Sequence, residues 1–427
     1  MKWRSRLTCV AVLAAVVLVC GSVVAAEAPR QPVRKLIAVE GEGYLETVDG
    51  YRVLHVKGTP EQMGRQHGAL LKEAIKQNVS FLLGGPKLGP GKVKARRIPR
   101  AMIAAVLNAA FADKVPKRFV REMNALAKAA GLPPWKVTAA NLIPEMFHCS
   151  GFALLKGASA EGKLYHGRVL DYGVDLKLQN HAVLILQQPE GRIPFANVSY
   201  AGFIGSVTGM NAKGVSIGEM GGGGVGRWQG IPMSFLVRMV LADAATLEQA
   251  VAVFRNNRRT CEYYYVIADA RANTAVGMRA VPETIELVKP GEKHRLLPTP
   301  VEDAVLLSAG SRYRNLVRLV RAGCGKFTQA TAIRLMDAPV AMKSNLHNAL
   351  MVPGDGVIWV ANADSEGRPA WKQKYYRFNI RELMRTRPAG RAASPDPPAA
   401  TSRGRLARGG PQQSSPTRTD QTVGGGP

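Results

Sequence analysis

The chain has 427 residues, of which 46% are hydrophobic, and its formal net charge is +27. This apolar content excludes a globally disordered chain and suffices for one large domain or two ordinary ones. The charge would suit a nucleic-acid-binding protein, but the basic residues are scattered and the densest run, KVKARRIPR at 92–100, has no interleaved aromatic side chains. We therefore expect no nucleic-acid partner and interpret the charge as a cationic surface that favours contact with anionic envelope material.

Residues 1–28 predict a secretory signal peptide. Three basic side chains, Lys2, Arg4 and Arg6, precede an apolar run that ends in small residues, with removal expected within Ala25–Ala28. The protein is then exported, to the periplasm or the extracellular medium. A lipoprotein modified at Cys20 and an uncleaved anchor are the alternatives. No later stretch is apolar over about 18 residues, so no other membrane span is expected.

The mature chain keeps three cysteines, Cys149, Cys261 and Cys324. An odd number leaves at least one free thiol in an export compartment, and no feature of the sequence supports a bridge between Cys261 and Cys324. The sequence has no C-x-x-C or H-E-x-x-H motif and no ligand cluster with metal spacing. We expect neither a metal site nor another cofactor.

Residues 29–148 are expected to form a mainly helical N-terminal part. Apolar side chains near helical spacing mark 60–83, 100–115 and 117–131, and the last of these segments ends in a glycine suited to a helix C-cap. A further short helix, with proline near its start, is predicted within 133–146.

From residue 149 the pattern becomes extended. Three hairpin-like units follow one another, namely CSGFALLK with LYHGRVLDYG, HAVLILQQ with IPFANVSY, and FIGSVTGM with GVSIGEM. Helices are predicted at 232–243 and 246–256 and near Arg312 and Thr328, and strands at 263–268, 274–279, 304–308, 348–352, 356–361 and 374–379. Such an order indicates an α+β layered fold with 149–387 as its core. Residues 388–427, basic and rich in Pro, Gly and Ser, predict a disordered tail.

The stretch FHCSGFALLKGASAEGKLYHGRVLDYG contains the candidate nucleophile. If the bond between His148 and Cys149 is cut, Cys149 gains a free α-amino group with an ordinary pKa of about 7.7–8.0. This amine can take the proton of the thiol, and the thiolate is the attacking species. Arg168 and Asp171 lie on the strand expected to pair with that of Cys149, where they can hold the amine and tune the thiol.

An acyl-transfer site also needs donors for the oxyanion, each of which typically contributes about 3–4 kcal/mol. Asn211, in the turn GMNAKG, offers a side-chain amide. Simpler interpretations exist: a turn residue for Asn211, a surface ion pair for Arg168 and Asp171, and a small buried hydrophobe for Cys149. A papain-like pair of Cys149 with His166 or His347 ranks lower, because no residue is clearly disposed to orient the ring.

Three stretches in order resemble the acyl-coenzyme A:6-aminopenicillanate acyltransferase-like family of cysteine N-terminal-nucleophile (Ntn) hydrolases, to which bile-salt hydrolases and acid ceramidase are related. They are GTPEQMGRQHGALL at 58–71, HCSGFALLKGASAEGKLYHGRVLDYG at 148–173 and GSVTGMNAKGVSIG at 205–218. A fourth, weaker match is SAGSRYRNL at 308–316. The resemblance extends over about residues 50–380.

The resemblance implies an αββα sandwich of two antiparallel sheets between helix layers. It also implies self-cleavage before Cys149, into an α chain that ends at His148 and a catalytic β chain. The implied activity is hydrolysis or transfer of the acyl group of a linear amide through a thioester on Cys149. Arg168 and Asp171 orient and tune the freed amine, and Asn211 helps to form the oxyanion hole.

The sequence also departs from this family. The region before the Ser-Arg-Tyr segment reads PTPVEDAVLL, without the asparagine that relatives often have, so Asn345 in KSNLHN is the remaining candidate for a second oxyanion donor. Two rival functions remain open: a lipid-directed acylhydrolase of the ceramidase or phospholipase B-like kind, and a non-catalytic cationic protein that binds the envelope on an Ntn scaffold. We expect a small acyl-amide or lipid-like substrate.

Overall fold

The computed structural model describes residues 31–84, 100–111, 113–142, 149–223 and 226–389. The predicted signal peptide, His148 and almost all of the predicted tail lie outside these residues. None of the described helices is long and apolar enough to cross a bilayer.

The larger of two sheets has ten strands. Neighbouring strands are antiparallel except for β3 and β6, which are parallel. The spatial order is β1 (Arg34–Glu40), β2 (Gly43–Val48), β3 (Tyr51–Gly58), β6 (Ala182–Pro189), β7 (Phe195–Tyr200), β8 (Thr208–Asn211), β9 (Val215–Gly221), β10 (Tyr263–Asp269), β11 (Thr274–Ala280) and β12 (Ile285–Val288).

The smaller sheet has six strands and is antiparallel throughout. Its spatial order is β13 (Ala304–Leu307), β4 (Cys149–Leu154), β5 (Tyr165–Leu170), β14 (His347–Val352), β15 (Val357–Asn362) and β16 (Tyr376–Asn379). The first hairpin predicted from the sequence is therefore correct, and it supplies two adjacent strands of this sheet.

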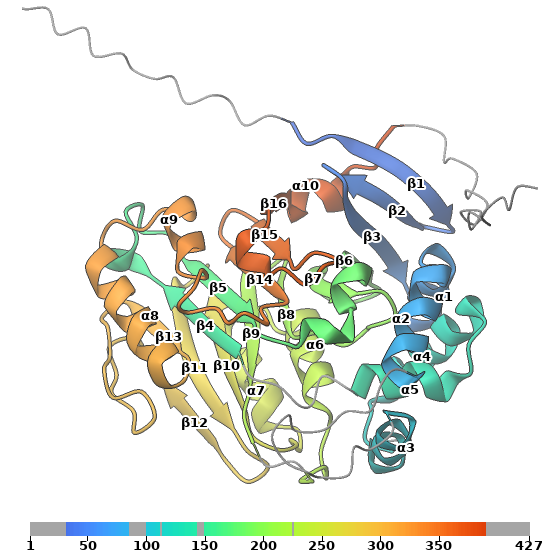
Figure 1. Ribbon diagram of the computed structural model, residues 1–427, viewed down its shortest axis with the longest axis horizontal. Coiled ribbons are helices and arrows are strands. Elements are labelled where there is room, and N and C mark those ends of the chain that lie inside the picture. Colours follow the sequence, from blue (N-terminus) through green and yellow to red (C-terminus); the bar gives the residue numbers. More distant parts are fainter. Residues whose placement is uncertain (1–30, 85–99, 112, 143–148, 224–225, 390–427) are drawn as a thin grey trace, which may run out of the picture.

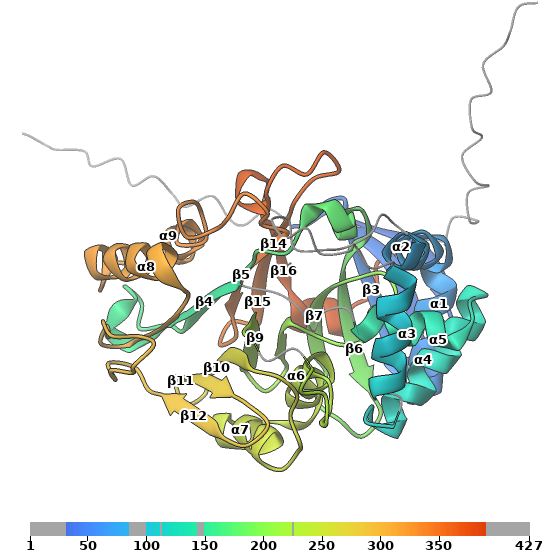
Figure 2. The same cartoon turned by 60° about the horizontal axis from the view of Figure 1, so that its bottom comes forward.

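The two sheets pack face to face between two layers of helices. Apolar side chains of α6 (Met233–Asp243) and α7 (Leu247–Arg255) form a core with the outer face of the large sheet. Those of α8 (Gly310–Gly323) and α9 (Gln329–Arg334) form another with the small sheet. Figure 2 shows the four layers in succession, from α8 and α9 through β4 and β5 to β10–β12 and α7. This is the αββα sandwich that the resemblance implies.

Glycines let the two sheets approach closely. A Cβ on Gly151 of β4 would lie 2.8 Å from the Sδ of Met220, and a Cβ on Gly277 of β11 would lie 2.7 Å from Leu307 Cδ1. Both distances are below ordinary van der Waals contact. The start of β4 and the end of β13 are therefore held against β9–β11, where the candidate site is found.

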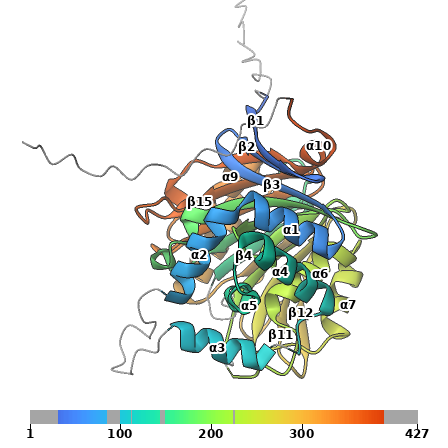
Figure 3. The ribbon, with the colours of Figure 1, turned by 90° about the vertical axis from the view of Figure 1, so that its right-hand side faces the viewer.

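The remaining helices, apart from α10 (Ile380–Arg385), form a cluster beside the sheets (Figure 3). They are α1 (Pro60–Leu70), α2 (Lys72–Gly84), α3 (Arg100–Phe111), α4 (Lys117–Ala130) and α5 (Pro134–Leu142). The entry to α1 has a capping box, in which Thr59 and Gln62 each bind the other's backbone amide.

Two glycines of α1 set its distance from α4. A Cβ on Gly64 would lie 2.2 Å from the carbonyl oxygen of Glu122, and one on Gly68 would lie 2.4 Å from that of Leu126. Because the obstacles are backbone atoms, they cannot turn aside. The Gly-x-x-x-Gly spacing within the first helix is thus explained by helix packing.

We expect Gly64→Ala to lower the free energy of unfolding by about 1–3 kcal/mol, the usual cost of overpacking, although alanine is the better helix former. Gly84→Ala, at the end of α2 where a new Cβ meets nothing within 4 Å, is the control and should cost nothing. Chemical denaturation of both variants measures the difference. An unchanged Gly64→Ala midpoint would contradict the packing argument.

Two parts of the large sheet were not predicted from the sequence. Strands β1–β3 precede the helices, so residues 29–148 supply strands as well as helices, and β3 continues the sheet through β6. Strand β12 is a short edge strand after β11. The predicted N-terminal part and the predicted core therefore share one sheet, and the described part of the chain folds as one body.

Candidate active site

Cys149 is the first residue of β4 and lines a cavity of about 500 Å³, a size typical of small-molecule sites. Its side chain is buried, with 6% of the residue exposed. In the register of β4 and β5, Cys149 is opposite Leu170, and Arg168 is opposite Gly151. Asp171 follows directly after β5, so the predicted hairpin brings all three candidate side chains to one end of the strand pair.

Arg168 lies between the sheets and is fully buried. Its Nη1 donates to the carbonyl oxygen of Val169, and its Nη2 lies 3.5 Å from Oε2 of Glu219 on β9. A Cβ on Gly218 would lie 2.9 Å from Arg168 Cδ, so this glycine makes room for the side chain. Arg168 is thus a buried cation paired with a carboxylate of the opposite sheet.

Asp171 pairs with a different arginine. Its Oδ2 accepts a hydrogen bond of 2.6 Å from Nη1 of Arg312, and its Oδ1 accepts one of 3.0 Å from the backbone amide of Met342. Arg312, in the first turn of α8, also donates to Ser150 Oγ at 3.2 Å, which in turn bonds Ser308 Oγ at 2.7 Å. Arg312 and Ser308 line the cavity with Cys149.

Two ion pairs therefore lie beside the thiol: Arg168 with Glu219, which is buried, and Asp171 with Arg312, which is partly buried. The simpler interpretation of Arg168 and Asp171 as a surface ion pair is wrong, because both are buried and each has its own partner. Burial raises the pKa of the Asp171 carboxyl, while its hydrogen bond from Met342 and the charge of Arg312 lower it.

Burial also raises the pKa of the Cys149 thiol, to about 11. This pKa is the net result of burial, of the charge of Arg168 and a hydrogen bond with the Asp171 backbone, which lower it, and of the carboxylates of Glu219 and Asp171, which raise it. The thiol of the intact chain is thus protonated at neutral pH. Attack on an acyl carbon requires a base that removes this proton.

Neither histidine considered as that base lines the cavity. His166 bonds Ser216 through Nδ1 at 2.8 Å, and burial lowers its pKa to about 3. The ring of His347 lies between the hydroxyls of Tyr200, at 2.9 Å, and Thr208, at 3.0 Å, and burial lowers its pKa well below the usual value. A papain-like pair with either ring is not formed among the described residues.

Asn211 is in a different place from the predicted oxyanion hole. It ends β8, where its Nδ2 donates to the carbonyl oxygens of Leu241 and Ala244 and its Oδ1 accepts from the amides of Lys213 and Val215. These four bonds fasten the β8–β9 turn to the end of α6, and Asn211 does not line the cavity. The oxyanion assignment is therefore corrected: the turn interpretation is the one the geometry bears out.

The side-chain amide of Asn345 is also hydrogen-bonded to other groups of the protein. Its Nδ2 donates to the carbonyl oxygens of Leu170 and His347 and to Oδ1 of Asn348, and its Oδ1 accepts from the amide of Trp371. It lowers the pKa of Asp171 by a side-chain hydrogen bond but does not line the cavity. Asn345 supports Asp171 and is not placed to hold an oxyanion.

The sequence alone does not single out Glu219 and assigns no role to Arg312. A single glutamate in the otherwise apolar strand VSIGEM signals a buried, paired charge, because an unpaired carboxylate is rarely buried. The residues Ser150 and Ser308 carry no comparable signal, since their contact depends on the pairing of β13 with β4. No disulfide joins Cys261 and Cys324 among the described residues.

We expect Glu219→Gln to lower the pKa of the Cys149 thiol below about 11, because a carboxylate that raises it is removed. At a fixed alkaline pH the thiolate fraction, and with it the rate of alkylation by iodoacetamide, should then increase. Peptide-level mass spectrometry separates Cys149 from the exposed Cys324. Glu122→Gln, which removes a buried carboxylate bonded to Arg238, is the control. An equal or slower rate for Glu219→Gln would contradict the assigned electrostatics.

The fold and the site define the class: an α+β two-sheet sandwich in which an interior strand begins with a buried cysteine at a cavity. Residues 158–294 match the family model described as acyl-coenzyme A:6-aminopenicillanic acid acyl-transferase. This segment includes Arg168, Asp171 and Glu219 and begins after Cys149. The resemblance to that family predicted from the motifs is thereby confirmed.

Curated relatives are distant. Protein dcd1B of Dictyostelium discoideum is 24% identical over 378 residues, which cover 79% of this chain and 75% of that protein. The N-acylethanolamine-hydrolyzing acid amidase of Caenorhabditis elegans is 22% identical over 315 residues, which cover 66% of this chain and 85% of that protein. Acid ceramidase of Rattus norvegicus is 23% identical over 211 residues, which cover 42% of this chain and 52% of that protein.

Solved structures also match. The Caenorhabditis elegans N-acylethanolamine-hydrolyzing acid amidase ortholog gives a TM-score of 0.41 at 17% identity, covering 54% of this chain and 100% of that chain. A variant of the conjugated bile acid hydrolase from Clostridium perfringens gives 0.38 at 11% identity, covering 55% of this chain and 93% of that chain.

Proposed function

We propose that this protein is a cysteine amidohydrolase or acyltransferase of the Ntn type, which acts on a linear acyl amide through a thioester on Cys149. The observation that carries the proposal is the position of Cys149: first residue of an interior strand, at the wall of a cavity, beside one buried and one partly buried ion pair. The names of the matching relatives, which include amidases and a ceramidase, point to the same class of bond.

The proposed base is the α-amine of Cys149, freed by self-cleavage of the His148–Cys149 bond. Support comes from the chemistry of the site: the thiol is protonated at neutral pH, His166 and His347 are turned to other partners, and an α-amine titrates near working pH. Asp171, fixed by Arg312 and the Met342 amide, lies next to the strand start and is suited to hold the resulting ammonium.

In the proposed reaction the amine takes the thiol proton, and the sulfur forms a bond to the acyl carbon. The carbonyl π-electrons move to oxygen, and the C–N bond then breaks as the ammonium returns its proton to the leaving amine. Water or an amine, deprotonated by the same α-amine, attacks the thioester and releases the sulfur. Arg312 and Ser308 are the proposed oxyanion donors, because both are polar, line the cavity and contact Ser150, the neighbour of Cys149.

The cavity favours an acyl amide over the two rival functions. Its walls near Cys149 include apolar side chains, which suits an apolar acyl part, but its lining also contains basic residues that a purely lipid-binding cleft does not need. A non-catalytic envelope-binding protein needs neither a cavity at the thiol nor the buried Arg168–Glu219 pair beside it, whose desolvation is costly.

The test is to incubate the purified protein with a series of N-acyl amides and to follow both amine release and intact mass at short times. We expect amine release together with a mass increase equal to one acyl group on the fragment that contains Cys149, removable by hydroxylamine. Amine release without any thioester would contradict the covalent route, and no release from any acyl amide would contradict the activity.

We further propose that the protein is exported, on the support of the basic start and apolar run in its first 28 residues. The expected result is a mature protein that begins close to Ala28 and is recovered from the exported fraction. A cell-associated protein that keeps Met1 would contradict this.

A further inference from the structure

A row of four side chains leads away from Cys149 across the inner face of the large sheet. In the strand register, Met220 of β9, Tyr264 of β10, Arg279 of β11 and Glu286 of β12 stand directly opposite one another. Side chains opposite one another in adjacent strands share a face. The row starts near Cys149, because Gly151 of the same strand β4 packs against Met220.

The spacing between strands gives the distance that a substrate can span along this row. Adjacent strands lie about 4.8 Å apart, so the backbone of Arg279 is about 10 Å from that of Met220, measured across the sheet. Met220, Tyr264 and Arg279 all line the same cavity as Cys149. A substrate bound with its carbonyl carbon at the sulfur can therefore extend along the row as far as Arg279.

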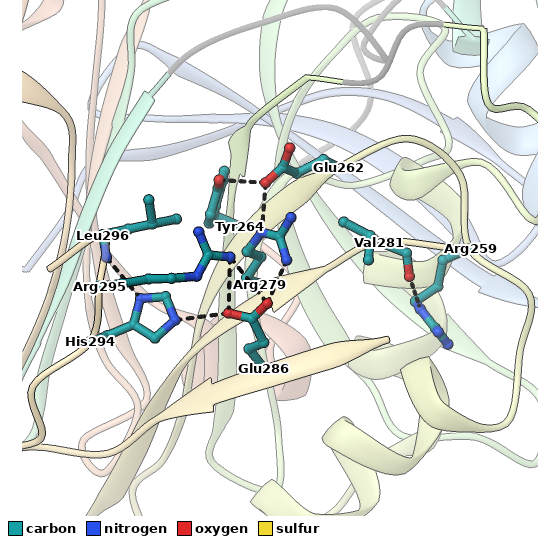
Figure 4. Close-up of polar contacts among 9 residues, drawn as sticks. All are labelled: Arg259, Glu262, Tyr264, Arg279, Val281, Glu286, His294, Arg295 and Leu296. Carbon is teal, nitrogen blue, oxygen red and sulfur yellow. Dashed lines mark hydrogen bonds and ion pairs between the residues drawn. The ribbon is translucent and has the colours of Figure 1, made fainter. Parts of the chain in front are cut away.

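Two carboxylates hold Arg279 in place (Figure 4). Its Nε donates to Glu262 Oε1 at 2.6 Å and its Nη1 to Glu286 Oε1 at 2.5 Å. Tyr264 donates its hydroxyl to the same Glu262 oxygen at 2.6 Å. A guanidinium has five N–H donors, so these two bonds fix its orientation and leave donors for a ligand.

His294 approaches the row from the segment that joins β12 to β13. Its Nδ1 accepts from the amide of Leu296 at 3.2 Å, which leaves Nε2 as the donor to Glu286 Oε2 at 2.8 Å. Arg295 contacts Glu286 as well, as Figure 4 shows. The cluster therefore places two glutamates against two arginines, and the Nε2–H of His294 is a further donor to Glu286.

Of the described charged side chains at this site, only basic ones line the cavity. The basic side chains that line the cavity are Arg279, His294 and Arg312, and none of its described lining residues is an aspartate or a glutamate. The partner carboxylates Glu262 and Glu286 are outside the lining. The cavity thus combines apolar walls, the thiol and a fixed guanidinium, which lies two strands away from Met220.

We propose that Arg279 is a specificity-determining residue that binds a carboxylate of the substrate, so that the preferred substrate is an acyl amide with an anionic end. This inference rests on the proposed function, since it assigns the substrate class of the same site. A guanidinium with two parallel donors matches a carboxylate in geometry as well as in charge. The carboxylate belongs to the amine part or to the acyl part, and matched substrates distinguish the two sources.

The experiment uses two pairs of substrates that differ only in charge. In the first pair, N-octanoylglycine carries its carboxylate on the amine part, and N-octanoylglycinamide is its neutral match. In the second pair, the mono-N-ethylamide of suberic acid carries its carboxylate on the acyl part, and its neutral match has a primary amide in place of that carboxylate. We expect the wild-type protein to prefer the acid of one pair, and Arg279→Met to lower kcat/KM for that acid about 10- to 100-fold, the size expected for a lost bond between charged groups. The matched neutral amide should change less than about threefold.

Two variants separate recognition from structure. Arg279→Lys keeps the charge without the fork and should restore part of the preference. Arg295→Met removes an exposed arginine that contacts the same Glu286 but does not line the cavity, and it should leave the preference intact. Equal loss on acid and neutral amide, or no loss on either acid, would overturn the inference.

Binding measurements distinguish a failure of this inference from a failure of the proposed function. In Cys149→Ser, calorimetry with the same compounds should show tighter binding of the acid, and Arg279→Met in that background should abolish the difference. If acids bind preferentially but no amide is cleaved, the inference stands and the proposed function fails. If amides are cleaved without a charge preference in turnover or binding, the function stands and the inference fails.

Discussion

Cys149→Ala is expected to remove activity on acyl amides, by about 10³-fold or more, because a covalent route loses its nucleophile. The side chain is small and buried, so the variant should fold with little loss of stability. Cys149→Ser is the matched control: it keeps a weaker nucleophile in the same position and should retain a trace of acyl-enzyme formation. The measurement is amine release together with intact mass. Full turnover by Cys149→Ala would rule out the thioester.

Arg168→Met is expected to lower the free energy of unfolding by about 3–5 kcal/mol, the usual cost of leaving one member of a buried ion pair without its partner. Arg168 is fully buried and its pairing with Glu219 joins the two sheets. Because its charge lowers the pKa of the Cys149 thiol, its loss should also raise that pKa and slow alkylation at a fixed pH.

The double variant Arg168→Met with Glu219→Gln is the control for this pair. Removing both charges should recover a substantial part of the stability, since no uncompensated carboxylate remains between the sheets. Chemical denaturation of the three variants completes the double-mutant cycle. Simple additivity of the two single losses would show that the two side chains do not interact.

Much of the fold could be predicted because its signals are local. The hairpin of β4 and β5 has alternating and apolar strands on either side of a turn, and it alone determines that Cys149, Arg168 and Asp171 come together. The strands β1–β3 were not predicted, because charged residues in RKLIAVE and YRVLHVKG interrupt the alternation of apolar and polar residues that indicates a strand. Their place in the sheet depends on β6, which lies more than 120 residues away in the chain.

The partners of the charged residues could not be predicted. Arg168 and Asp171 lie three positions apart, which suggests a mutual pair, yet each one pairs across a different interface: Arg168 with Glu219 of the facing sheet, Asp171 with Arg312 of α8. Such contacts depend on how the layers pack, and the spacing of residues along the chain does not indicate them.

Asn211 illustrates the opposite error. A motif with an amide in a turn suggested a catalytic donor, but the geometry of the β8–β9 turn already accounts for the residue, since all four of its side-chain bonds are to backbone groups of the turn and the neighbouring helix end. A turn asparagine satisfies local backbone donors and acceptors first, and only a cavity beside it would favour chemistry.

The most direct measurement is the amino-terminal residue of each polypeptide in the purified wild-type protein, determined together with intact masses. We expect two polypeptides, one of which starts at Cys149, and a single uncleaved polypeptide from Cys149→Ala. An active wild-type protein that remains one polypeptide, with the nitrogen of Cys149 still in a peptide bond, would contradict the claim that this residue provides both the nucleophile and the base.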